Sequence, residues 1–446
     1  MNTLNRRKFL KNAGSVAAAA ASAPLVKPSW SQTSPNDTIH IAVMGIRGRG
    51  TSHYTEFARI PNVEVTYLCD IDERVFAPHL AEMEKLSPRK PRTEVDIRKI
   101  LDDKDVDAIS VAAPDHWHAL ATVWACQAGK DVYVEKPTSH NVWEGRQAVE
   151  AARKYNRIVQ AGMQNRSNRN VRAAIQFLHE GGIGDVYMAK GLCFKPRESI
   201  GRRPNGPVPE GVHYDLWLGP APYRPFNENR FHYNWHWFWD YGCADLGNQG
   251  PHQMDIARWG MDIYDYPVKI HCAGGYFVFD SDQETPNTQM ATLEFADGRI
   301  IQFEVRGLYT NAENEITIGN LFFGSKGWMH LNGSTWKTYF GRKNEPGPSM
   351  DSSEGAADPS NLRGTGDSSH FKDFIDAMRS RKVEDLAADI EEGQRSTALC
   401  HLSNIAYRLG RQLEFDPNTE KFVSDAQADL YLSRRYRAPY IVPEKV

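Results

Sequence analysis

Cysteine is scarce in this sequence, and its spacing excludes two kinds of site. The chain contains six cysteines, with no CxxC pair and no cluster of cysteines with histidines. They are Cys69, Cys126, Cys193, Cys243, Cys272 and Cys400. A structural zinc site needs closely spaced thiolate or imidazole ligands, and a disulfide framework needs a denser set of cysteines. We therefore expect buried free thiols and no metal site.

The sequence also lacks long apolar runs and an excess of one charge. Apart from the N-terminus, no stretch approaches the roughly 20 apolar residues that a membrane span requires. Lysine and arginine number 53, against 56 aspartate and glutamate residues, which gives a formal net charge of −3 at pH 7. This balance provides no electrostatic basis for binding a nucleic acid or an anionic membrane. We expect no nucleic-acid partner and no membrane span.

The first residues have the composition of an export signal rather than of a folded domain. A twin arginine, Arg6 and Arg7, precedes an alanine-rich run at 15–24. This order is typical of a twin-arginine signal peptide, which is removed after export and takes no part in the fold. We assign residues 1–35 to this signal and a linker, and we expect a periplasmic or secreted protein.

After the signal, strands and helices alternate up to about residue 163. The chain of 446 residues is too long for one ordinary core, and its 41% hydrophobic and 24% charged residues are typical of a globular protein. Alternation of this kind predicts a parallel sheet with crossover helices. The predicted strands are 38–45, 63–72, 106–114, 131–137 and 157–163, and the predicted helices are 51–60, 118–130 and 143–155.

A different pattern follows and predicts a second domain. Between 268 and 340, alternating strands are separated by the turns ADGR and GSKG, which favour antiparallel hairpins. The other predicted elements are a helix at 165–181, a strand at 184–194, a long loop at 341–366, and helices at 367–381 and 389–411. We place the two domains at 36–162 and 163–446.

A glycine-rich turn, GIRGRG, follows the first predicted strand. Gly45 and Gly50 occupy the first and third glycine positions of a dinucleotide-binding turn, whereas Arg47 replaces the second glycine and Gly48 follows it. Backbone amides at the start of the next helix, beginning near Arg49, can hold a diphosphate. The simpler alternative is that the glycines only permit a tight connection between strand and helix.

An acidic residue stands where this kind of fold binds ribose. Asp70 closes the second predicted strand, and a carboxylate there accepts hydrogen bonds from the adenosine ribose hydroxyls. The same charge repels the extra phosphate of NADP. We therefore expect NAD as the cofactor.

Three further motifs complete a resemblance to a known family. PDHWHA lies at 114–119, YVEKP at 133–137 and GPHQMDIARWG at 250–260. In this order they resemble the Gfo/Idh/MocA oxidoreductases over nearly all of the chain after the signal. The resemblance implies an α/β protein with an N-terminal Rossmann domain and a C-terminal α/β domain that has a large, open, mostly antiparallel sheet. It also implies sugars, polyols or their derivatives as substrates, and a homo-oligomer.

The resemblance assigns roles to particular residues. Lys136, in the EKP motif, matches a lysine that in relatives lies near the nicotinamide and the reacting hydroxyl. The later family pattern D-x-G-x-H-x-x-D falls on Asn248, His252 and Asp255, so that asparagine replaces the first aspartate. Asp245 is close by but out of register. Further cofactor contacts are implied at Pro114, His116, His118 and Glu135.

Removing a hydride from a carbinol requires a base beside the hydroxyl. His252 has a suitable intrinsic pKa, and Lys136 can stabilise the developing alkoxide or act as the base if burial lowers its pKa. Asn248 can hydrogen-bond but carries no charge. The alternatives are that Lys136 is a solvated turn residue, and that Asn248 and His252 have capping or packing roles. Asp255 is either a substrate contact or a structural partner.

The aromatic block between 213 and 242 is a candidate sugar-binding surface. Sugars stack their C–H faces on aromatic rings and present hydroxyls to polar groups, and the block combines both residue types. The candidate substrate contacts are Tyr214, Trp217, Arg230, Trp235 and His236, together with Lys195 and Arg197 from the FKPRE stretch. The alternative is that these aromatic residues form a satellite core under a long loop.

An export signal and a nucleotide cofactor are compatible if the cofactor stays bound, because the twin-arginine route carries folded proteins. We expect a NAD-retaining oxidoreductase that acts on a carbohydrate or glycoside hydroxyl. One alternative, known among exported relatives, is a redox-neutral glycosidase that works by oxidation, elimination, hydration and reduction. Another is a non-catalytic sugar-binding protein.

Overall fold

A computed structural model describes residues 38–333, 335–350 and 366–446. The signal peptide predicted for residues 1–35 lies outside these described residues. Each of the six cysteines is a buried free thiol, which confirms that expectation. Among the described helices, none combines the length and the apolar character needed to cross a bilayer.

The first sheet has six parallel strands in the order β3-β2-β1-β4-β5-β6. Its strands are β1 Ile39–Met44, β2 Val63–Cys69, β3 Arg92–Glu94, β4 Ala108–Val111, β5 Asp131–Val134 and β6 Val159–Ala161. The five predicted strands all exist, and β3 is an additional short edge strand. All residues of β4 and β5 are buried, because helices cover both faces of the sheet.

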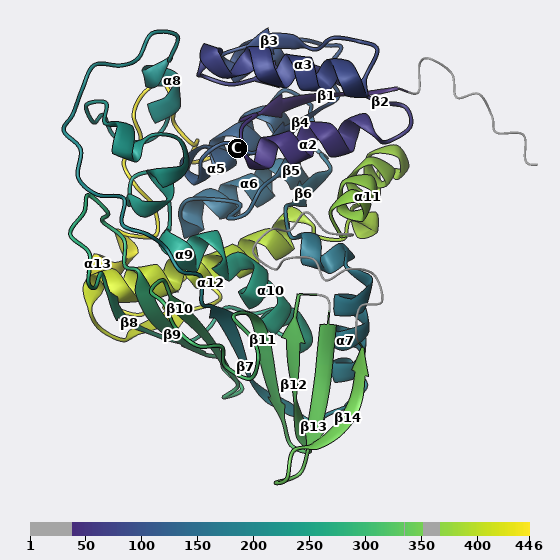
Figure 1. The fold of residues 1–446 in the computed structure, drawn as a ribbon, viewed down its shortest axis with the longest axis vertical. Coiled ribbons are helices and arrows are strands. Elements are labelled where there is room, and N and C mark those ends of the chain that lie inside the picture. The colour runs from purple at the N-terminus through teal and green to yellow at the C-terminus, as the bar shows by residue number, and fades with distance from the viewer. Residues whose placement is uncertain (1–37, 334, 351–365) are drawn as a thin grey trace, which may run out of the picture. The chain divides into compact units, whose positions relative to one another are not determined.

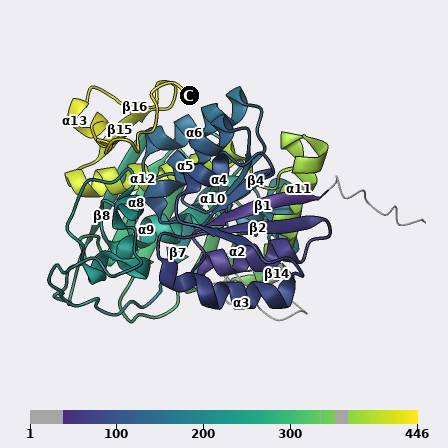
Figure 2. The ribbon, with the colours of Figure 1, turned by 90° about the horizontal axis from the view of Figure 1, so that it is seen from above.

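The covering helices divide into two groups (Figure 2). They are α2 Arg49–Ala58, α3 Phe76–Leu86, α4 Ile97–Leu101, α5 Asp115–Gln127 and α6 Val142–Lys154. Residues of α2 and α3 share one hydrophobic cluster with the sheet, and residues of α4, α5 and α6 share another. This three-layer arrangement is a Rossmann fold, as the alternating pattern predicts.

Two segments from the far end of the chain complete these clusters. Helix α11, Gly366–Ser380, places Phe371 4.6 Å from Tyr133 of β5 and 4.8 Å from Phe57 of α2, measured between ring centroids. On the opposite face, Tyr440 of the C-terminal tail packs 5.6 Å from Trp117 of α5. The tail, whose sequence has no clear pattern, therefore contributes to the core of the parallel sheet.

The second sheet has ten strands in the order β14-β13-β12-β11-β7-β10-β9-β8-β15-β16 (Figure 1). They are β7 Val186–Cys193, β8 Lys269–Gly275, β9 Thr288–Glu294, β10 Ile300–Arg306, β11 Ile318–Gly324, β12 Gly327–Asn332, β13 Thr335–Phe340, β14 Glu345–Met350, β15 Leu413–Asp416 and β16 Lys421–Phe422. Neighbouring strands are antiparallel except β7 and β10. The hairpins expected at ADGR and GSKG join β9 to β10 and β11 to β12, which confirms the predicted fold class.

One prediction for this region is wrong. Strand β14 lies inside the segment 341–366, where a loop is predicted, and it pairs with β13. The prolines at 346 and 348 suggest a loop, but β14 is an edge strand, where proline is tolerated because one side of the strand needs no hydrogen bond. Residues 351–365 lie outside the described residues.

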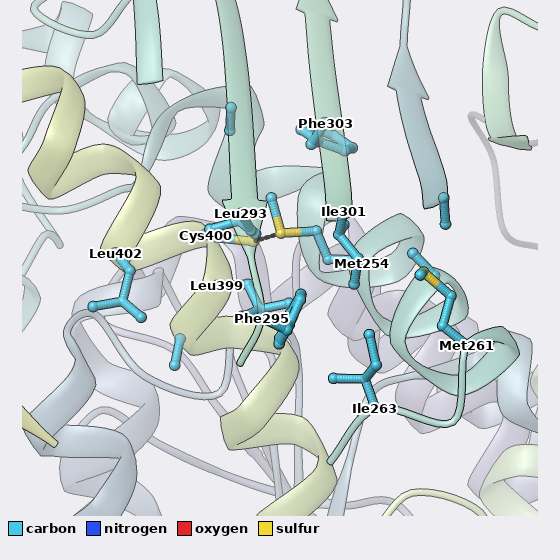
Figure 3. Packing of buried hydrophobic residues seen from close by; sticks show 14 of the residues in the cluster. Met254, Met261, Ile263, Leu293, Phe295, Ile301, Phe303, Leu399, Cys400 and Leu402 are labelled. Atoms are coloured by element: carbon cyan, nitrogen blue, oxygen red, sulfur yellow. Dashed lines mark hydrogen bonds between the residues drawn. The ribbon is translucent and has the colours of Figure 1, made fainter. Parts of the chain in front are cut away.

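Two helices cover the inner face of the second sheet. Met254 of α10, Gly250–Gly260, and Cys400 of α12, Ile390–Leu409, meet above strands β9 and β10, with their sulfur atoms 3.8 Å apart (Figure 3). Leu293 and Ile301 of these strands belong to the same buried cluster. Because α12 also packs against α6, it links the cores of the two sheets.

The remaining helices are short, except α7. They are α7 Arg169–His179, α8 Tyr214–Leu218, α9 Ala244–Asn248 and α13 Ala426–Asp429, with 3-10 turns at Glu73–Val75, Gln164–Ser167, Glu228–Arg230, His232–Trp237 and Val383–Asp385. The helix predicted at 165–181 is thus divided by Asn168, whose side chain caps α7 by accepting from two backbone amides.

Candidate active site

A cavity of about 560 Å³ opens at the carboxyl ends of β1, β4 and β5. This edge of a parallel sheet is where Rossmann folds bind their ligands. The cavity is lined by the glycine-rich turn and Asp70, and by the EKP lysine, the end of α9 and the start of α10. The predicted site residues that line it are Gly45, Arg47, Gly48, Arg49, Asp70, Pro114, His118, Glu135, Lys136, Lys195, Trp217, Trp235, His236, Asn248 and His252.

The glycine-rich turn leaves no room for side chains at two positions. Gly45 has a φ of +80°, and a Cβ there would lie 2.7 Å from the carbonyl oxygen of Ala112. A Cβ on Gly50 would lie 1.8 Å from the oxygen of Gly45, so this glycine lets α2 approach the strand closely. Gly48 caps α2 at a φ of +53°, and exposed Arg47 also faces the cavity. Gly50 itself does not line the cavity and acts through this packing.

Asp70 is held in place by the turn that it faces. Its carboxylate accepts hydrogen bonds from the backbone N–H of Ile46 at 3.1 Å and of Asp72 at 3.1 Å. Burial raises the pKa of Asp70 to about 6, although these two hydrogen bonds and the charge of Arg47 oppose the rise. The group is mostly ionised at neutral pH and can accept hydrogen bonds from ribose hydroxyls.

Glu135 provides a buried negative charge beneath the centre of the cavity. Its carboxylate accepts from Arg49 Nε at 2.7 Å and from Gln164 Nε2 at 2.9 Å, and it lies 3.1 Å from His53 Nε2. Burial alone raises the pKa of Glu135, but the Arg49 charge and the contacts with His53 and Lys136 hold it well below its usual range. The carboxylate is therefore ionised and orients the residues around it.

Lys136 lines the same cavity as Asp70. Its Nζ donates to the backbone oxygen of Asn248 at 2.6 Å and to the side-chain Oδ1 of Asn248 at 3.2 Å. Burial lowers the pKa of Lys136, while the charges of Glu135 and Asp115 raise it again. A lysine with two fixed acceptors facing a cavity is unlike a solvated turn residue.

His252 is the third residue of α10 and lines the same cavity. The side chain is only 2% exposed, and neither ring nitrogen has a hydrogen-bond partner among the described residues. Burial and the nearby charge of Lys136 lower the pKa of His252 to about 3, so that the imidazole is neutral at pH 7. A buried, neutral histidine with open nitrogens can accept a proton from a ligand.

Asp115 also belongs to this site, although the sequence reasoning did not select it. It lies in the PDHWHA motif as the first residue of α5, is 2% exposed, and its Oδ2 has no partner among the described residues. Burial raises the pKa of Asp115 well above its usual value, against the opposing charge of Lys136. The motif was the available signal, but its neighbouring histidines were chosen instead.

Those two histidines occupy different places. The ring nitrogens of His118 lie 2.6 Å from the carbonyl oxygen of Pro137 and 2.7 Å from that of Ala113. His118 therefore contacts the backbone of the EKP loop, and it also lines the cavity. His116 does not line the cavity. Its Nε2 lies 2.9 Å from the carbonyl oxygen of Trp217, and burial lowers its pKa to about 3. His116 therefore connects α5 to the aromatic region.

The aromatic block supplies both a cavity wall and a satellite core. Trp235 and His236 line the cavity with their rings stacked at 3.6 Å, and exposed Tyr233, which the sequence reasoning did not select, lies beside them. Trp217 lines the cavity from a buried cluster, where it stacks on Tyr214 at 5.5 Å. Tyr214 does not line the cavity, because its hydroxyl donates to the carbonyl of residue 224.

Three other candidate substrate residues point elsewhere. Asp255 accepts from Arg166 Nε at 2.8 Å and Nη2 at 2.9 Å, which favours the structural alternative for this residue. Arg230 donates to Asn205 Oδ1 at 3.0 Å and supports the loop. Arg197 forms a bidentate pair with Asp245 instead of lining the cavity.

The residues present fit a dinucleotide. Gly45 and Gly48 of the turn, Arg49 at the start of α2 and the ionised Asp70 line one cavity together with Lys136 and His252. This is the order in which a Rossmann domain meets the diphosphate, the adenosine ribose and the reactive end of such a cofactor.

Comparisons with known proteins agree with this geometry. Residues 39–163 match a family described as "Oxidoreductase family, NAD-binding Rossmann fold". Residues 197–314 and 361–442 match one described as "Oxidoreductase family, C-terminal alpha/beta domain". The chain belongs to the Gfo/Idh/MocA oxidoreductases. It is an NAD-dependent oxidoreductase by family, as its motifs predict.

Curated relatives match this chain over a limited length. A glycosyl hydrolase family 109 protein from Shewanella sp. is 27% identical over 172 residues, which are 34% of this chain and 38% of that protein. An α-N-acetylgalactosaminidase from Shewanella oneidensis is 28% identical over the same shares of each chain. The alignment thus spans less than two fifths of these relatives.

Solved Gfo/Idh/MocA structures share the fold at low identity. A levoglucosan dehydrogenase in complex with NADH has a TM-score of 0.65 and 16% identity, covering 84% of this chain and 99% of that chain. The WlbA dehydrogenase from Chromobacterium violaceum, in complex with NADH and UDP-GlcNAcA, has a TM-score of 0.62 and 20% identity, covering 85% and 96%. An aldose-aldose oxidoreductase from Caulobacter crescentus, complexed with glycerol, has a TM-score of 0.62 and 16% identity, covering 85% and 100%.

Proposed function

We propose that this protein is an exported enzyme that retains NAD and oxidises a hydroxyl of a carbohydrate or glycoside. The observation that carries the proposal is the shared cavity. A dinucleotide cradle at Gly45 and Asp70 is continuous with Lys136 and His252, whose side chains suit proton chemistry at a hydroxyl.

Bound NAD would supply the hydride acceptor. The residues that would hold it are the turn from Gly45 to Gly50, with backbone amides for the diphosphate, and Asp70 for the adenosine ribose. The negative charge of Asp70 disfavours NADP. Because the enzyme would keep its cofactor, no supply of free nucleotide outside the cytoplasm is required. A second carbonyl compound, such as an aldose or a ketose, would take the hydride back and return the bound cofactor to its oxidised form between turnovers.

The chain's own residues would handle the proton of the substrate. The ammonium of Lys136 donates a hydrogen bond to the reacting oxygen and lowers the proton affinity of that oxygen. The neutral imidazole of His252 accepts the hydroxyl proton as the hydride leaves. Burial lowers the pKa of Lys136, and the charge of Glu135 opposes this lowering.

Carbohydrate is the substrate class that the cavity wall suits. Trp235 and Tyr233 offer ring faces to the C–H face of a sugar, and Gln249 and Lys195 offer polar groups nearby. Several structural relatives are complexed with sugars or sugar nucleotides, which supports this class. The homo-oligomeric state remains a prediction.

A redox-neutral glycosidase is the second candidate, and the matches to glycosyl hydrolase family 109 proteins favour it. In net terms, water is added across the glycosidic bond, and the sugar and its aglycone are released without a change in redox state. Lys136 and His252 would again be the groups that hold or move protons.

The purified protein, without added nucleotide, should be incubated with a panel of α- and β-methyl and nitrophenyl glycosides, together with an excess of an aldose or a ketose that can accept the hydride. Mass spectrometry then separates two results. A product two mass units lighter indicates an oxidised glycoside, and a free aglycone without a net redox change indicates the glycosidase. Absence of both products from a protein that contains NAD, across a broad panel, contradicts the proposed activity.

A further inference from the structure

Asp245 is buried beside the candidate catalytic residues, and the reaction proposed above does not use it. The side chain is 3% exposed and accepts from Arg197 through Nε at 3.0 Å and through Nη2 at 2.6 Å. Arg197 also donates to the hydroxyl of Tyr233 at 2.9 Å and lies 5.0 Å from the ring centroid of Trp237. A guanidinium with these contacts fixes the plane of the carboxylate.

The backbone that presents Asp245 is strained. Ala244, immediately before it, has a φ of +61°, a conformation that residues with a Cβ rarely adopt. The preceding carbonyl, of Cys243, accepts from Asn404 Nδ2 at 3.0 Å, and this bond holds the start of α9. Such strain persists where surrounding contacts impose it, commonly at functional sites.

Asp245 determines which way the amide of Asn248 points. Asn248 Nδ2 donates to Asp245 Oδ1 at 3.3 Å. An ionised carboxylate only accepts hydrogen bonds, so the amino group of the amide must face Asp245, and Oδ1 must face Lys136. Lys136 then donates both to this Oδ1, at 3.2 Å, and to the backbone oxygen of Asn248, at 2.6 Å.

We propose that the Arg197–Asp245 ion pair is a positioning pair that keeps Lys136 a hydrogen-bond donor, by fixing the amide of Asn248. The inference rests on the proposed function and deepens it. Two of the three N–H groups of the ammonium are directed at Asn248, and the third remains for the reacting oxygen of the substrate. Lys136 is thereby the electrophilic donor, and the base is His252.

Asp245 lies three residues before Asn248, the position where the family pattern has aspartate. This chain therefore has an amide at that position, and the nearby carboxylate contacts the amide instead. In this chain the negative charge lies three residues earlier and acts on the lysine through the amide. The sequence alone shows only that Asp245 is out of register, because its link to Arg197 joins residues 48 positions apart.

Chemical labelling of Lys136 tests the proposal without any substrate. Acetic anhydride acetylates only the neutral amine. The labelling rate of Lys136 is measured relative to that of exposed Lys382 by peptide mass spectrometry. A slow relative rate means that the hydrogen bonds of Lys136 stabilise its protonated form. The measurement is made on the full-length protein as purified, with its NAD content recorded. The other charged groups that act on Lys136 are Glu135, Asp115, Arg49 and Lys195, and they are the same in every variant.

The first variant is Asp245→Asn, which keeps the shape but allows the amide of Asn248 to turn. We expect about a fivefold faster relative labelling of Lys136 at pH 7, because one hydrogen bond to the ammonium is lost. The double variant Asp245→Asn with Asn248→Asp exchanges the carboxylate and the amide, and should restore slow labelling. Wild-type labelling in folded Asp245→Asn would overturn the proposal.

A second variant is needed because Asp245→Asn leaves the partly buried Arg197 without its ion-pair partner, which can destabilise the fold. Arg197→Met combined with Asp245→Asn removes both charges, and the same acceleration is expected. Unchanged labelling in this folded protein would also overturn the proposal. Because labelling needs no turnover, an enzyme that fails on every glycoside but shows these changes would refute the proposed function and leave the positioning role standing.

Discussion

The ammonium of Lys136 lies 2.6 Å from the backbone oxygen of Asn248, which joins the EKP loop of the Rossmann domain to the short helix α9 of the second domain. The two residues are 112 positions apart in the chain. This bond fixes the lysine in the wall of the cavity that Asp70 also lines, where a substrate oxygen and the reactive end of a dinucleotide can meet.

Replacing Lys136 by methionine should abolish turnover while the cofactor stays bound. Loss of the donor to the reacting oxygen is expected to reduce kcat at least about 100-fold, with little change in the NAD content of the purified protein. Steady-state kinetics and nucleotide analysis of the variant measure both.

Lys130 offers a matched control. It is also a buried lysine, and its Nζ donates to the carbonyls of Asp103 and Val106, each at 2.7 Å, but it does not line the cavity. Lys130→Met should lower the melting temperature and leave kcat within about twofold. Equal losses of turnover in both variants would contradict a special role for Lys136.

Binding of NAD should weaken as the pH falls through about 6. Burial raises the pKa of Asp70 to about 6, so at lower pH the carboxylate gains a proton and loses acceptor capacity for the ribose hydroxyls. We expect about a tenfold higher Kd at pH 5 than at pH 7, measured by calorimetry on protein stripped of nucleotide. In Asp70→Asn this pH dependence should disappear, and a profile like that of the wild type would contradict the assignment.

Gly50→Ala should prevent cofactor binding and destabilise the Rossmann domain. Its new Cβ would lie 1.8 Å from the carbonyl oxygen of Gly45, a backbone atom that can move only if the turn moves. Gly206→Ala is the matched control, because a Cβ there meets nothing within 4 Å. Thermal unfolding and NAD content should change in the first variant only, and an unaffected Gly50→Ala protein would contradict the role of this turn.

Asp255→Asn separates a structural role from a role at the substrate. Breaking its buried pair with Arg166 is expected to cost about 3 kcal/mol of unfolding free energy. Burial raises the pKa of Asp255, but the Arg166 charge outweighs it and holds the pKa below its usual value. Its stabilising effect is therefore present above the usual carboxyl pKa and is lost as the pH falls through the lower folded value.

Urea unfolding at pH 7 measures the loss of unfolding free energy in Asp255→Asn. The KM of this variant for any substrate found should stay within about twofold of the wild-type value. A large rise in KM at unchanged stability would instead place Asp255 in the substrate site.

The local signals in the sequence pointed to residues that the structure brings to one cavity. The glycine-rich turn, Asp70 and the EKP lysine depend on strand–turn–helix patterns within a few dozen residues, and each lies at the cavity. Arg47, which replaces the second glycine, has an exposed side chain and lines the cavity.

The substrate end was predicted less completely, because it depends on contacts between distant segments. Arg197 and Asp255 carry the right chemistry for a sugar, but buried partners, Asp245 and Arg166, occupy them. Asp115 lies within a quoted motif, yet only the folded chain shows that it is buried beside Lys136. No pattern of residue types indicates such pairings in advance.

The most direct test of the account is the nucleotide content of the protein, combined with its proposed export. Protein recovered from the periplasmic fraction and purified without added nucleotide is denatured, and the released NAD(H) and NADP(H) are quantified by mass spectrometry. The account predicts close to one NAD(H) per chain and little NADP(H). A protein that is empty and also fails to bind added NAD would contradict the central claim and favour a sugar-binding protein without catalytic activity.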